Sequence, residues 1–274
     1  MMTTDVGRFV DVDGLRTFYV KVGTGTPLVM IHGGSPGACA RVNWGANIDA
    51  LAAAGFTVYA FDQPGYGRTD NPVDFSLEYR VQHAKAFIAA LGIERMIVMG
   101  NSQGSYIAAR IALEGPGVIE KLVLVSSGTL APRGDAAAER MAREHSERLA
   151  SYEPSLENMR TMTRETLVNH EQITEELVQE RYEMSIGKNR EADGLRRQTK
   201  PPRQISLEEL GRLSMPALLM FGANDSGVAM ERMVALFRAI PGAELHVFDH
   251  CGHWVQWDQV GRFNAIVRDF LRGS

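Results

Sequence analysis

Runs of consecutive apolar residues alternate along the chain with segments in which apolar residues recur every three to four positions. The runs are typical of buried strands, and the spaced pattern is typical of helices that cover a sheet. Strands are expected at residues 8–12, 16–22, 28–31, 56–61, 96–99, 121–127, 216–222 and 244–248, and core helices at 43–54, 76–91, 106–113, 230–240 and 260–271. The first two strands flank an Asp13-Gly14 turn and should form an antiparallel hairpin at a sheet edge. The pattern predicts an α/β fold, a mostly parallel eight-stranded sheet with helices on both faces.

The alternation stops between about residues 130 and 215, where no segment has the pattern of a strand. Residues 140–150, 155–169 and 174–186 are instead charged and rich in helix-forming residues. We therefore expect residues 1–130 and 215–274 to form one core, and residues 131–214 to form an inserted helical lid. Because ligands of parallel α/β folds bind at the carboxyl ends of the strands, the lid should cover that edge of the sheet.

A serine stands between a predicted strand and a predicted helix, in the segment Gly100-Asn101-Ser102-Gln103-Gly104. So sharp a turn holds the serine in a strained backbone conformation, and a Cβ at either glycine would collide with the neighbouring elements. The turn lifts the hydroxyl above the sheet and directs the first N–H groups of the helix at whatever it attacks. Gly-x-Ser-x-Gly in this context favours a nucleophile, the alternative being a purely structural turn.

A second loop of small residues, His-Gly-Gly-Ser-Pro-Gly at positions 32–37, follows the predicted strand 28–31. Successive small residues leave backbone N–H groups unshielded, and unshielded N–H groups suit an anion. The loop could serve only as a tight turn. Beside a serine nucleophile, however, it is better interpreted as a donor to the oxyanion that develops during the reaction.

A serine hydroxyl is a poor nucleophile at neutral pH and needs a base within hydrogen-bond reach and an acid that orients the base. The chain order Ser, Asp, His is typical of this kind of sheet. Asp225 follows the predicted strand 216–222, so its carboxylate is expected at the carboxyl edge of the sheet. The alternative is that Asp225 caps the next helix. The rival position after the preceding strand holds Ser126 and Ser127, which cannot orient a histidine.

The seven histidines differ in the elements that carry them. Three fall on predicted helices and are expected to be solvated: His83, His145 and His170. Two are expected to be structural, one inside the last strand and one in the small-residue loop: His246 and His32. The remaining candidates for the base, His250 and His253, both follow the last strand. Gly252 gives the backbone the freedom to present His253 and the following helix anchors it, which favours His253.

Composition restricts the function classes further. The chain has 274 residues, 45% hydrophobic and 23% charged, and its net charge of −4 gives no basic footprint for nucleic acid. It shows no secretory leader and no apolar run of membrane-spanning length. The two cysteines, Cys39 and Cys251, lack metal-binding spacing. We expect a cytoplasmic protein that acts on a small molecule without a metal, cofactor or membrane.

The chain resembles the α/β-hydrolases throughout, and most closely the carbon–carbon bond hydrolases that cleave meta-cleavage products in aromatic degradation. The resemblance rests on residues 32–38, the elbow residues 100–102, the segment 171–183 and the Cys-Gly-His-Trp-Val-Gln-Trp segment 251–257. It implies an α/β-hydrolase fold whose triad is Ser102, His253 and Asp225. It also implies an oxyanion hole formed by the N–H groups of Gly34 and Gln103.

The resemblance further implies a polar part of the pocket that holds the carboxylate end of a dienoate. Five residues would form it: Gly33, Asn43, Asn101, Arg181 and Trp254. The planar fork of an arginine suits a carboxylate in a way that lysine does not. Relatives are often oligomeric, so a homo-oligomer is expected by analogy.

Two departures from the family pattern concern the substrate. The family usually has Met-Gly-Gly after the serine, whereas this chain has Gln103-Gly104-Ser105, which keeps the backbone N–H and makes the pocket wall more polar. The segment 188–203 is unusually basic and does not match clearly. Both leave room for another substrate on the same catalytic residues.

Three functions are compatible with these residues. The first is hydrolysis of a carbon–carbon bond in a 2-hydroxy-6-oxohexa-2,4-dienoate, and the second is hydrolysis of a small ester or lactone. The third is ligand binding without catalysis, against which the complete triad argues. Ser102 excludes haloalkane dehalogenases and epoxide hydrolases in their usual form, because both need an aspartate at this position.

Overall fold

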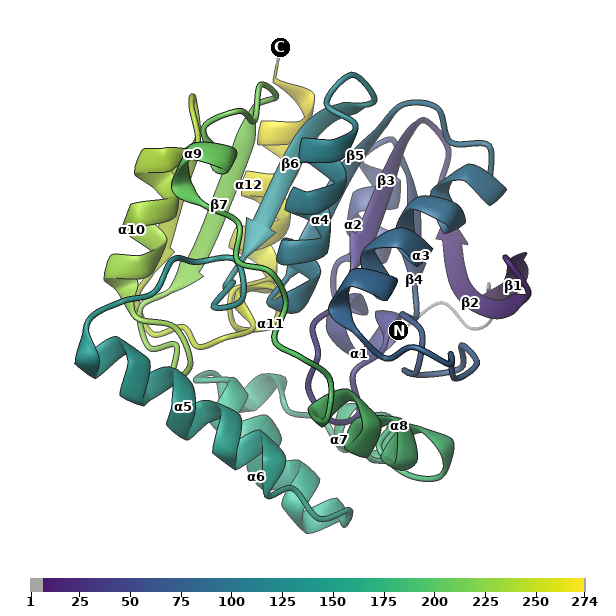
Figure 1. Cartoon of the computed structure of the whole chain (residues 1–274), viewed down its shortest axis with the longest axis vertical. Coiled ribbons are helices and arrows are strands. Elements are labelled where there is room, and N and C mark those ends of the chain that lie inside the picture. Colours follow the sequence, from purple (N-terminus) through teal and green to yellow (C-terminus); the bar gives the residue numbers. More distant parts are fainter. Residues whose placement is uncertain (1–6, 274) are drawn as a thin grey trace.

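The computed structural model describes residues 7–273, which contain one eight-stranded sheet in the order β1-β2-β4-β3-β5-β6-β7-β8 (Figure 1). The strands β1 and β2 pair antiparallel, as do β2 and β4, and the other pairs are parallel. This confirms the predicted sheet and the hairpin at its edge. The strands are β1 (Gly7–Val12), β2 (Leu15–Val22), β3 (Thr26–Ile31), β4 (Phe56–Phe61), β5 (Met96–Asn101), β6 (Ile119–Val125), β7 (Ala217–Gly222) and β8 (Glu244–Phe248).

Helices cover both faces of the sheet, because successive side chains of each buried strand point to opposite faces. On β3, Val29 and Ile31 join the core under α3 (Leu77–Ala90), α4 (Gln103–Glu114) and α10 (Met230–Ala239). Leu28 and Met30 join the core under α1 (Ala40–Trp44), α2 (Ile48–Ala53) and α12 (Val260–Arg272) (Figure 1). Two short helices, α9 (Leu207–Leu210) and α11 (Val255–Asp258), complete the core.

The single helix predicted at 43–54 is wrong, since the chain forms the two short helices α1 and α2 there. The break falls at Asn47, whose side chain is buried. Its Nδ2 donates to the carbonyl of Gln256 at 3.1 Å and to Oδ1 of Asn264 at 2.9 Å. These contacts with the C-terminal part of the chain outweigh the local preference for one continuous helix.

Of the five α-helices between β6 and β7, the first four and a 3₁₀ turn lie below the carboxyl ends of the strands in the view of Figure 1. They are α5 (Ala136–Ala150), α6 (Leu156–Thr166), η1 (His170–Gln172), α7 (Glu175–Glu183) and α8 (Lys188–Arg197). The side chains of Asp135, Ser155 and Thr174 cap α5, α6 and α7 by accepting from first-turn N–H groups. In the described part of the chain, no helix combines the length and apolarity needed to cross a membrane.

Candidate active site

The Ser102 backbone has the strain that its sequence context predicts. The residue follows β5 and begins α4 with φ 56° and ψ −120°, in the left-handed region that side chains rarely adopt. A Cβ on Gly100 would lie 2.3 Å from the backbone of Gly104, and one on Gly104 would lie 2.1 Å from the carbonyl of Ile31. Only glycine therefore fits on either side of the turn.

Asp225 and His253 form a hydrogen-bonded pair beyond the ends of β7 and β8. The Nδ1–H of His253 donates to Oδ2 of Asp225 at 2.7 Å. The other carboxylate oxygen accepts from the N–H groups of Gly227 at 2.8 Å and Val228 at 3.2 Å. The next helix is preceded by Ala229, so Asp225 does not cap it. Both oxygens of the carboxylate are thus held in place, and they hold the imidazole in turn.

The electrostatics of the pair make His253 a stronger base than a free histidine. Burial by itself would lower the pKa of His253. The charge of Asp225 and its hydrogen bond outweigh burial and raise the pKa above the ordinary value of 6.5. The rival His250 has an exposed side chain that faces only its neighbour Asp249, at 3.5 Å. Of the two histidines after β8, His253 is the one oriented by a buried acid.

Of the three histidines expected in solvent, His83 is buried, which contradicts the prediction, and His145 is only partly exposed. His83 is buried with Nε2 2.9 Å from the hydroxyl of Thr17, and burial lowers its pKa to about 4. His145 faces inward from α5, and burial lowers its pKa to about 4 as well. The third, His170, is exposed. The prediction for His83 failed because the inward face of a helix is set by tertiary packing.

His32 and His246 lie where the sequence places them. His32 is fully buried, accepts from the N–H of Gln63 at 2.9 Å and donates to the carbonyl of Gly33 at 2.6 Å. Burial lowers its pKa to about 3, so it is neutral and fixes the shape of the small-residue loop. His246 lies within β8.

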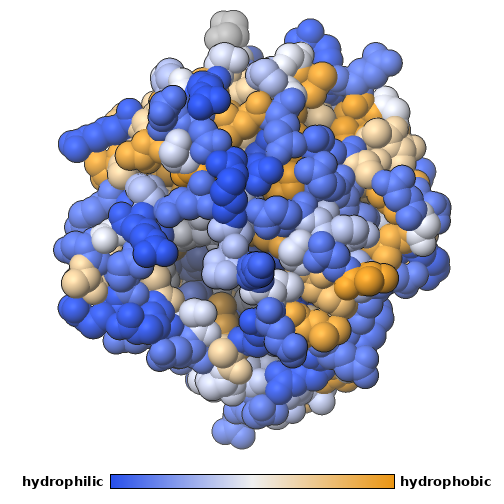
Figure 2. Space-filling model, viewed as in Figure 1, coloured by the Kyte–Doolittle hydropathy of each residue, from blue (hydrophilic) through white to orange (hydrophobic). Residues whose placement is uncertain are grey.

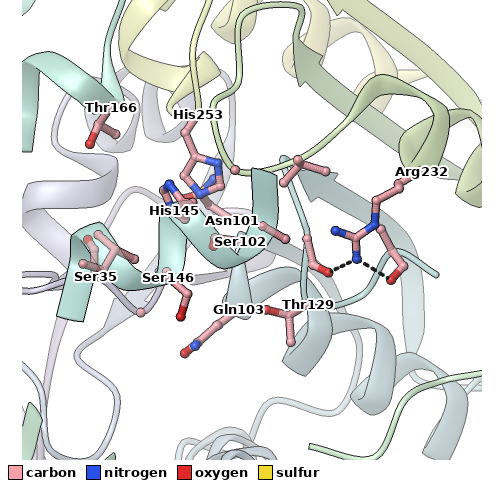
Figure 3. A pocket seen from close by; sticks show the side chains of 18 of the residues that line it. Ser35, Asn101, Ser102, Gln103, Thr129, His145, Ser146, Thr166, Arg232 and His253 are labelled. Atoms are coloured by element: carbon pink, nitrogen blue, oxygen red, sulfur yellow. Dashed lines mark hydrogen bonds between the residues drawn. The ribbon is translucent and has the colours of Figure 1, made fainter. Parts of the chain in front are cut away.

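A cavity of about 390 Å³ lies over Ser102, between the sheet and the lid helices (Figure 3). Figure 2 shows a recess in this region of the surface, rimmed mostly by hydrophilic side chains. The cavity brings together seven of the ten residues proposed from the sequence: Gly33, Gly34, Asn101, Ser102, Gln103, His253 and Trp254. Asp225 lies directly behind His253.

The small-residue loop approaches the serine closely, as an oxyanion donor must. A Cβ on Gly33 would lie 3.2 Å from Cβ of Ser102. One on Gly34 would lie 2.1 Å from Oε1 of Gln103, whose side chain folds over this glycine. The N–H of Gln103 belongs to the first residue of α4 and has no acceptor within the helix. The loop thus contacts Ser102 through Gly33 and packs against Gln103 through Gly34, next to the first N–H of α4.

Asn43 and Arg181 do not border the cavity, which corrects the expectation that they line it. Asn43 donates to Oδ1 of Asn101 at 3.1 Å and so positions a residue that does line it. The fully buried guanidinium of Arg181 donates to the hydroxyls of Thr163 at 3.0 Å and Ser35 at 3.2 Å. It also lies over the ring of Trp254, 4.7 Å from the centroid. These contacts with neutral oxygens and with the Trp254 ring hold Arg181 behind the residues that line the cavity.

The face of α5 that borders the cavity was missed by the sequence reasoning. Ala142, His145, Ser146 and Leu149 line the cavity and recur at intervals of three, four and seven residues. That spacing marks one helix face and was a signal in the sequence. Figure 3 shows the ring of His145 beside that of His253, and their centroids lie 5.7 Å apart.

Arg232 from α10 is a second lining residue that the sequence reasoning missed. Its guanidinium donates to the carbonyls of Gly128 at 2.8 Å and Ala131 at 3.1 Å (dashed lines in Figure 3). A third bond, at 2.7 Å, goes to the carbonyl of Pro132. Arg232 thus holds the loop that leads from β6 into the lid.

Among residues 7–273, no cluster of three or more His, Cys, Asp or Glu side chains has the arrangement needed to hold a metal ion. Cys39 and Cys251 are both buried and unpaired with each other. Burial raises the pKa of both thiols. Their thiols are therefore protonated at neutral pH.

Comparison with known proteins places this site in a family. The model of the alpha/beta hydrolase fold matches residues 26–260. The chain is 35% identical, over 97% of its length and 95% of the other, to a 2-hydroxy-6-oxononadienedioate/2-hydroxy-6-oxononatrienedioate hydrolase of Burkholderia vietnamiensis. It is 33% identical to a hydrolase with the same substrate names from Dechloromonas aromatica, over 95% and 92% of the two chains. A solved meta-cleavage product hydrolase of Pseudomonas fluorescens superposes with a TM-score of 0.86 at 32% identity, over 97% of each chain. The chain therefore belongs to the α/β-hydrolase family and, within it, to the meta-cleavage product hydrolases.

Proposed function

We propose that this protein hydrolyses the C5–C6 bond of a 2-hydroxy-6-oxohexa-2,4-dienoate that carries a substituent on C6. Water supplies a hydroxyl to C6 and a proton to C5, so the products are a carboxylic acid and 2-hydroxypenta-2,4-dienoate. The carbon leaving group is poor while the substrate is a dienol. Ketonisation at C2 with protonation at C5 comes first, because it converts the leaving group into one stabilised by the new carbonyl.

The proposed proton carrier is His253. Its Nδ1 is committed to Asp225 at 2.7 Å, which leaves Nε2 to exchange protons with Ser102, water or the substrate. The raised pKa of His253 suits this role, since the imidazolium that forms when it takes a proton is stabilised by Asp225. Ser102, or a water activated in its place, adds to the C6 carbonyl.

The proposed oxyanion hole consists of the N–H groups of Gly34 and Gln103. Gly34 belongs to the loop that contacts Ser102 through Gly33, and Gln103 is the first residue of α4, directly after Ser102. Losing one such donor raises the barrier by roughly 3 kcal/mol in related chemistry. The replacement of the family's methionine by Gln103 leaves this backbone donor in place.

The buried positive charge of Arg181 favours a dienoate substrate over a simple ester. Its hydrogen bonds to the described residues end on neutral oxygens, and burial lowers its pKa to about 10, so it remains a cation at neutral pH. A buried cation without a carboxylate partner is costly, and an anionic ligand nearby offsets the cost. Ser35 and Trp254 separate Arg181 from the cavity, and both border the cavity themselves. We propose that the substrate C1 carboxylate binds at this wall, where Asn101 completes its contacts.

The test is to follow the absorbance of a yellow 2-hydroxy-6-oxohexa-2,4-dienoate mixed with the pure protein. Fast bleaching that is lost in Ser102→Ala, together with slow cleavage of a nitrophenyl ester, is the expected result. Persistent colour with rapid ester cleavage would instead support an esterase or lactonase on the same residues. Activity unchanged by Ser102→Ala on both compounds would rule out the nucleophile.

Three further expectations belong to this proposal. Residues 131–214 would act as the lid, with residues 1–130 and 215–274 as the core; the position of α5–α8 supports this for residues 136–197, whereas α9 packs against α4 and α10 of the core. A homo-oligomer and a cytoplasmic location rest on the family resemblance. Light scattering of the purified protein and fractionation of the source cells test these two expectations.

A further inference from the structure

The loop that carries the proposed base lies against the end of the lid helix α6. It comprises residues 249–254, between β8 and α11, and we call it the histidine loop. The N–H of His253 donates to the carbonyl of Thr166, the last residue of α6, at 3.0 Å. A Cβ on Gly252 would lie 2.6 Å from the same carbonyl, so lid and loop are in close contact. Thr166 and His253 both line the cavity over Ser102 (Figure 3).

Asp258, at the end of α11, joins the same two segments through its side chain. Its Oδ2 accepts from the N–H of Gly252 at 2.6 Å, and its Oδ1 accepts from the N–H of Asn169 at 2.7 Å. The N–H of Val168 lies 3.0 Å from Oδ1 and 3.1 Å from Oδ2. One donor of the histidine loop and two donors of the lid thus converge on one carboxylate. We call the carboxylate and these three N–H groups the Asp258 clamp.

The clamp is buried, which makes its hydrogen bonds consequential. Asp258 is only 5% exposed. A carboxylate taken out of water is costly unless hydrogen bonds replace its hydration, and backbone N–H groups do so here. Hydrogen bonds to an ionised acceptor are also stronger than bonds between neutral groups. Loss of the carboxylate would deprive the buried N–H of Gly252 of its acceptor, so lid and loop should separate without it.

His253 lies inside a turn that Asp258 closes. The side chain of Asp258 holds Gly252, the residue before His253, and its N–H donates to the carbonyl of Trp254, the residue after it, at 2.9 Å. The backbone of His253 is therefore fixed on both sides. The ring is fixed separately, because Nδ1 donates to Asp225 at 2.7 Å. Both sets of contacts together determine where Nε2 stands.

We propose that Asp258 is a positioning residue for the proposed base: it clamps the histidine loop to the end of α6 and so sets the position of Nε2 of His253 relative to Ser102. The proposal rests on the role given to His253 in the proposed function. Asp258 acts through Gly252, since it lies outside the lining of the cavity. Proton transfer needs donor and acceptor about 3 Å apart, and a displacement of about 1 Å lowers the rate by up to about 100-fold.

Asp258→Asn is the first test, because an amide cannot satisfy the clamp in either orientation. Its NH₂ group opposes the N–H of Gly252 in one orientation and the N–H groups of Val168 and Asn169 in the other. We expect kcat for a 2-hydroxy-6-oxohexa-2,4-dienoate to fall about 10- to 100-fold, and KM to change less than about threefold.

The pKa of His253 reports the position of its ring. The charged and titratable groups that face the ring are Asp225, Arg181 and His145, and Asp258→Asn leaves all three unchanged. Asp225 raises this pKa above 6.5. If the ring moves away from Asp225, the pKa should fall toward 6.5, as measured by an NMR titration of the histidine resonances.

Asn169→Pro tests the lid side of the clamp and keeps the charge of Asp258. Proline deletes the N–H that donates to Oδ1, and the φ of Asn169, −82°, is close to that of proline. Asn169→Ala is the matched control, since it keeps this N–H and also loses the side chain that accepts from the N–H of Glu171. We expect the proline variant to have the lower kcat and a lowered pKa of His253. Equal kcat and equal pKa in the two variants would overturn the proposal. If Asp258→Asn does not fold, this pair provides the comparison.

A merely structural role of Asp258 gives a different result. Val267→Ala truncates a buried side chain of α12 and should lower stability without disturbing the clamp. Asp269→Asn removes an exposed carboxylate of the same helix and controls for the loss of charge. If Asp258→Asn loses stability as Val267→Ala does, while kcat and the pKa of His253 stay at the wild-type values, the proposal is overturned. A raised KM with unchanged kcat overturns it as well.

The NMR titration also separates this proposal from the proposed function. Should the wild type bleach no dienoate, the proposed function fails, and the pKa of His253 still tests the clamp. A lowered pKa in both Asp258→Asn and Asn169→Pro supports the clamp whatever the protein cleaves. A wild-type pKa in both variants rejects it.

Discussion

The imidazole rings of His145 and His253 lie 5.7 Å apart, centroid to centroid, with 46° between their planes. One ring comes from the lid helix α5 and the other from the loop after β8. Burial and the nearby His253 lower the pKa of His145 to about 4, whereas Asp225 raises the pKa of His253. At neutral pH the lid thus presents a neutral ring to the proposed base and keeps water from one of its faces.

Truncation of this lid ring should alter the pH dependence of the reaction. In the wild type, kcat/KM should fall as pH drops through the raised pKa of His253, because the protonated ring cannot act as a base. His145→Ala admits water, which weakens the desolvation that opposes protonation of His253, so its pKa should rise further. We expect the acid limb of the pH–rate profile to move to higher pH, with about a two- to tenfold loss at pH 6.5.

His145→Phe is the matched control, since it keeps a ring of similar size without the nitrogens. Its acid limb should stay at the wild-type position. Identical displacement of the limb in the alanine and phenylalanine variants would show that a nitrogen of His145, rather than exclusion of water, sets the pKa of His253.

Replacing Asp225, the proposed orienting acid, should show how much catalysis depends on the tautomer of His253 when the position of its ring is kept. In Asp225→Asn the amide oxygen can still accept from the N–H groups of Gly227 and Val228, so the loop should keep its shape. The amide nitrogen would face Nδ1 of His253 and stabilise the wrong tautomer. We expect kcat to fall by about 10³- to 10⁴-fold. Without the opposing charge, burial should pull the pKa of His253 below 6.5, which an NMR titration measures.

Much of the core was predictable because buried parallel strands are uninterrupted apolar runs that few other elements imitate. The predicted bounds 56–61 and 244–248 are those of β4 and β8. Ser102 and the Asp225–His253 pair followed from chain order and from the positions of strand ends. These signals are local, so a single sequence reveals them.

The inward faces of the lid were not predictable in the same way. Whether His145 faces water or His253 depends on how α5 packs on the core, and the sequence of α5 alone indicates that packing only weakly. Arg80 and Arg181 have the same difficulty, since a lone arginine on a helix is ordinarily solvated. Their burial results from contacts with residues distant in the chain, such as Gln103 and Ser35. The helix α8 was missed because its basic composition hides the pairing of Asp193 with the arginines one turn later.

Arg181→Met should weaken substrate binding without weakening the fold in proportion. The guanidinium is fully buried, and its bonds to the described residues end on neutral oxygens, so removing its charge removes a desolvation cost. We expect the free energy of unfolding to stay within about 1 kcal/mol of the wild type or to rise. KM for a dienoate should increase about tenfold or more, because the carboxylate loses its cation.

Chemical denaturation and steady-state kinetics on the same preparation check both parts of the Arg181 prediction. Arg164→Met, on an exposed position of α6, is the control for loss of one positive charge. A large drop in stability together with an unchanged KM would mean that Arg181 acts as a structural brace for the lid.

Buried His83 should make the fold sensitive to acid. Its pKa is lowered from 6.5 to about 4 in the folded state, so the unfolded chain binds the extra proton between these values. Stability must therefore decrease as pH falls below 6.5, by about 2 kcal/mol for this residue between pH 7 and pH 5. His83→Gln keeps a polar group for the hydroxyl of Thr17 and does not titrate, so its free energy of unfolding should fall less steeply over this range. Urea titrations at pH 7, 6 and 5 measure the difference. His170→Gln, at an exposed position, should follow the wild-type curve, and a His83→Gln curve parallel to the wild type would contradict the prediction.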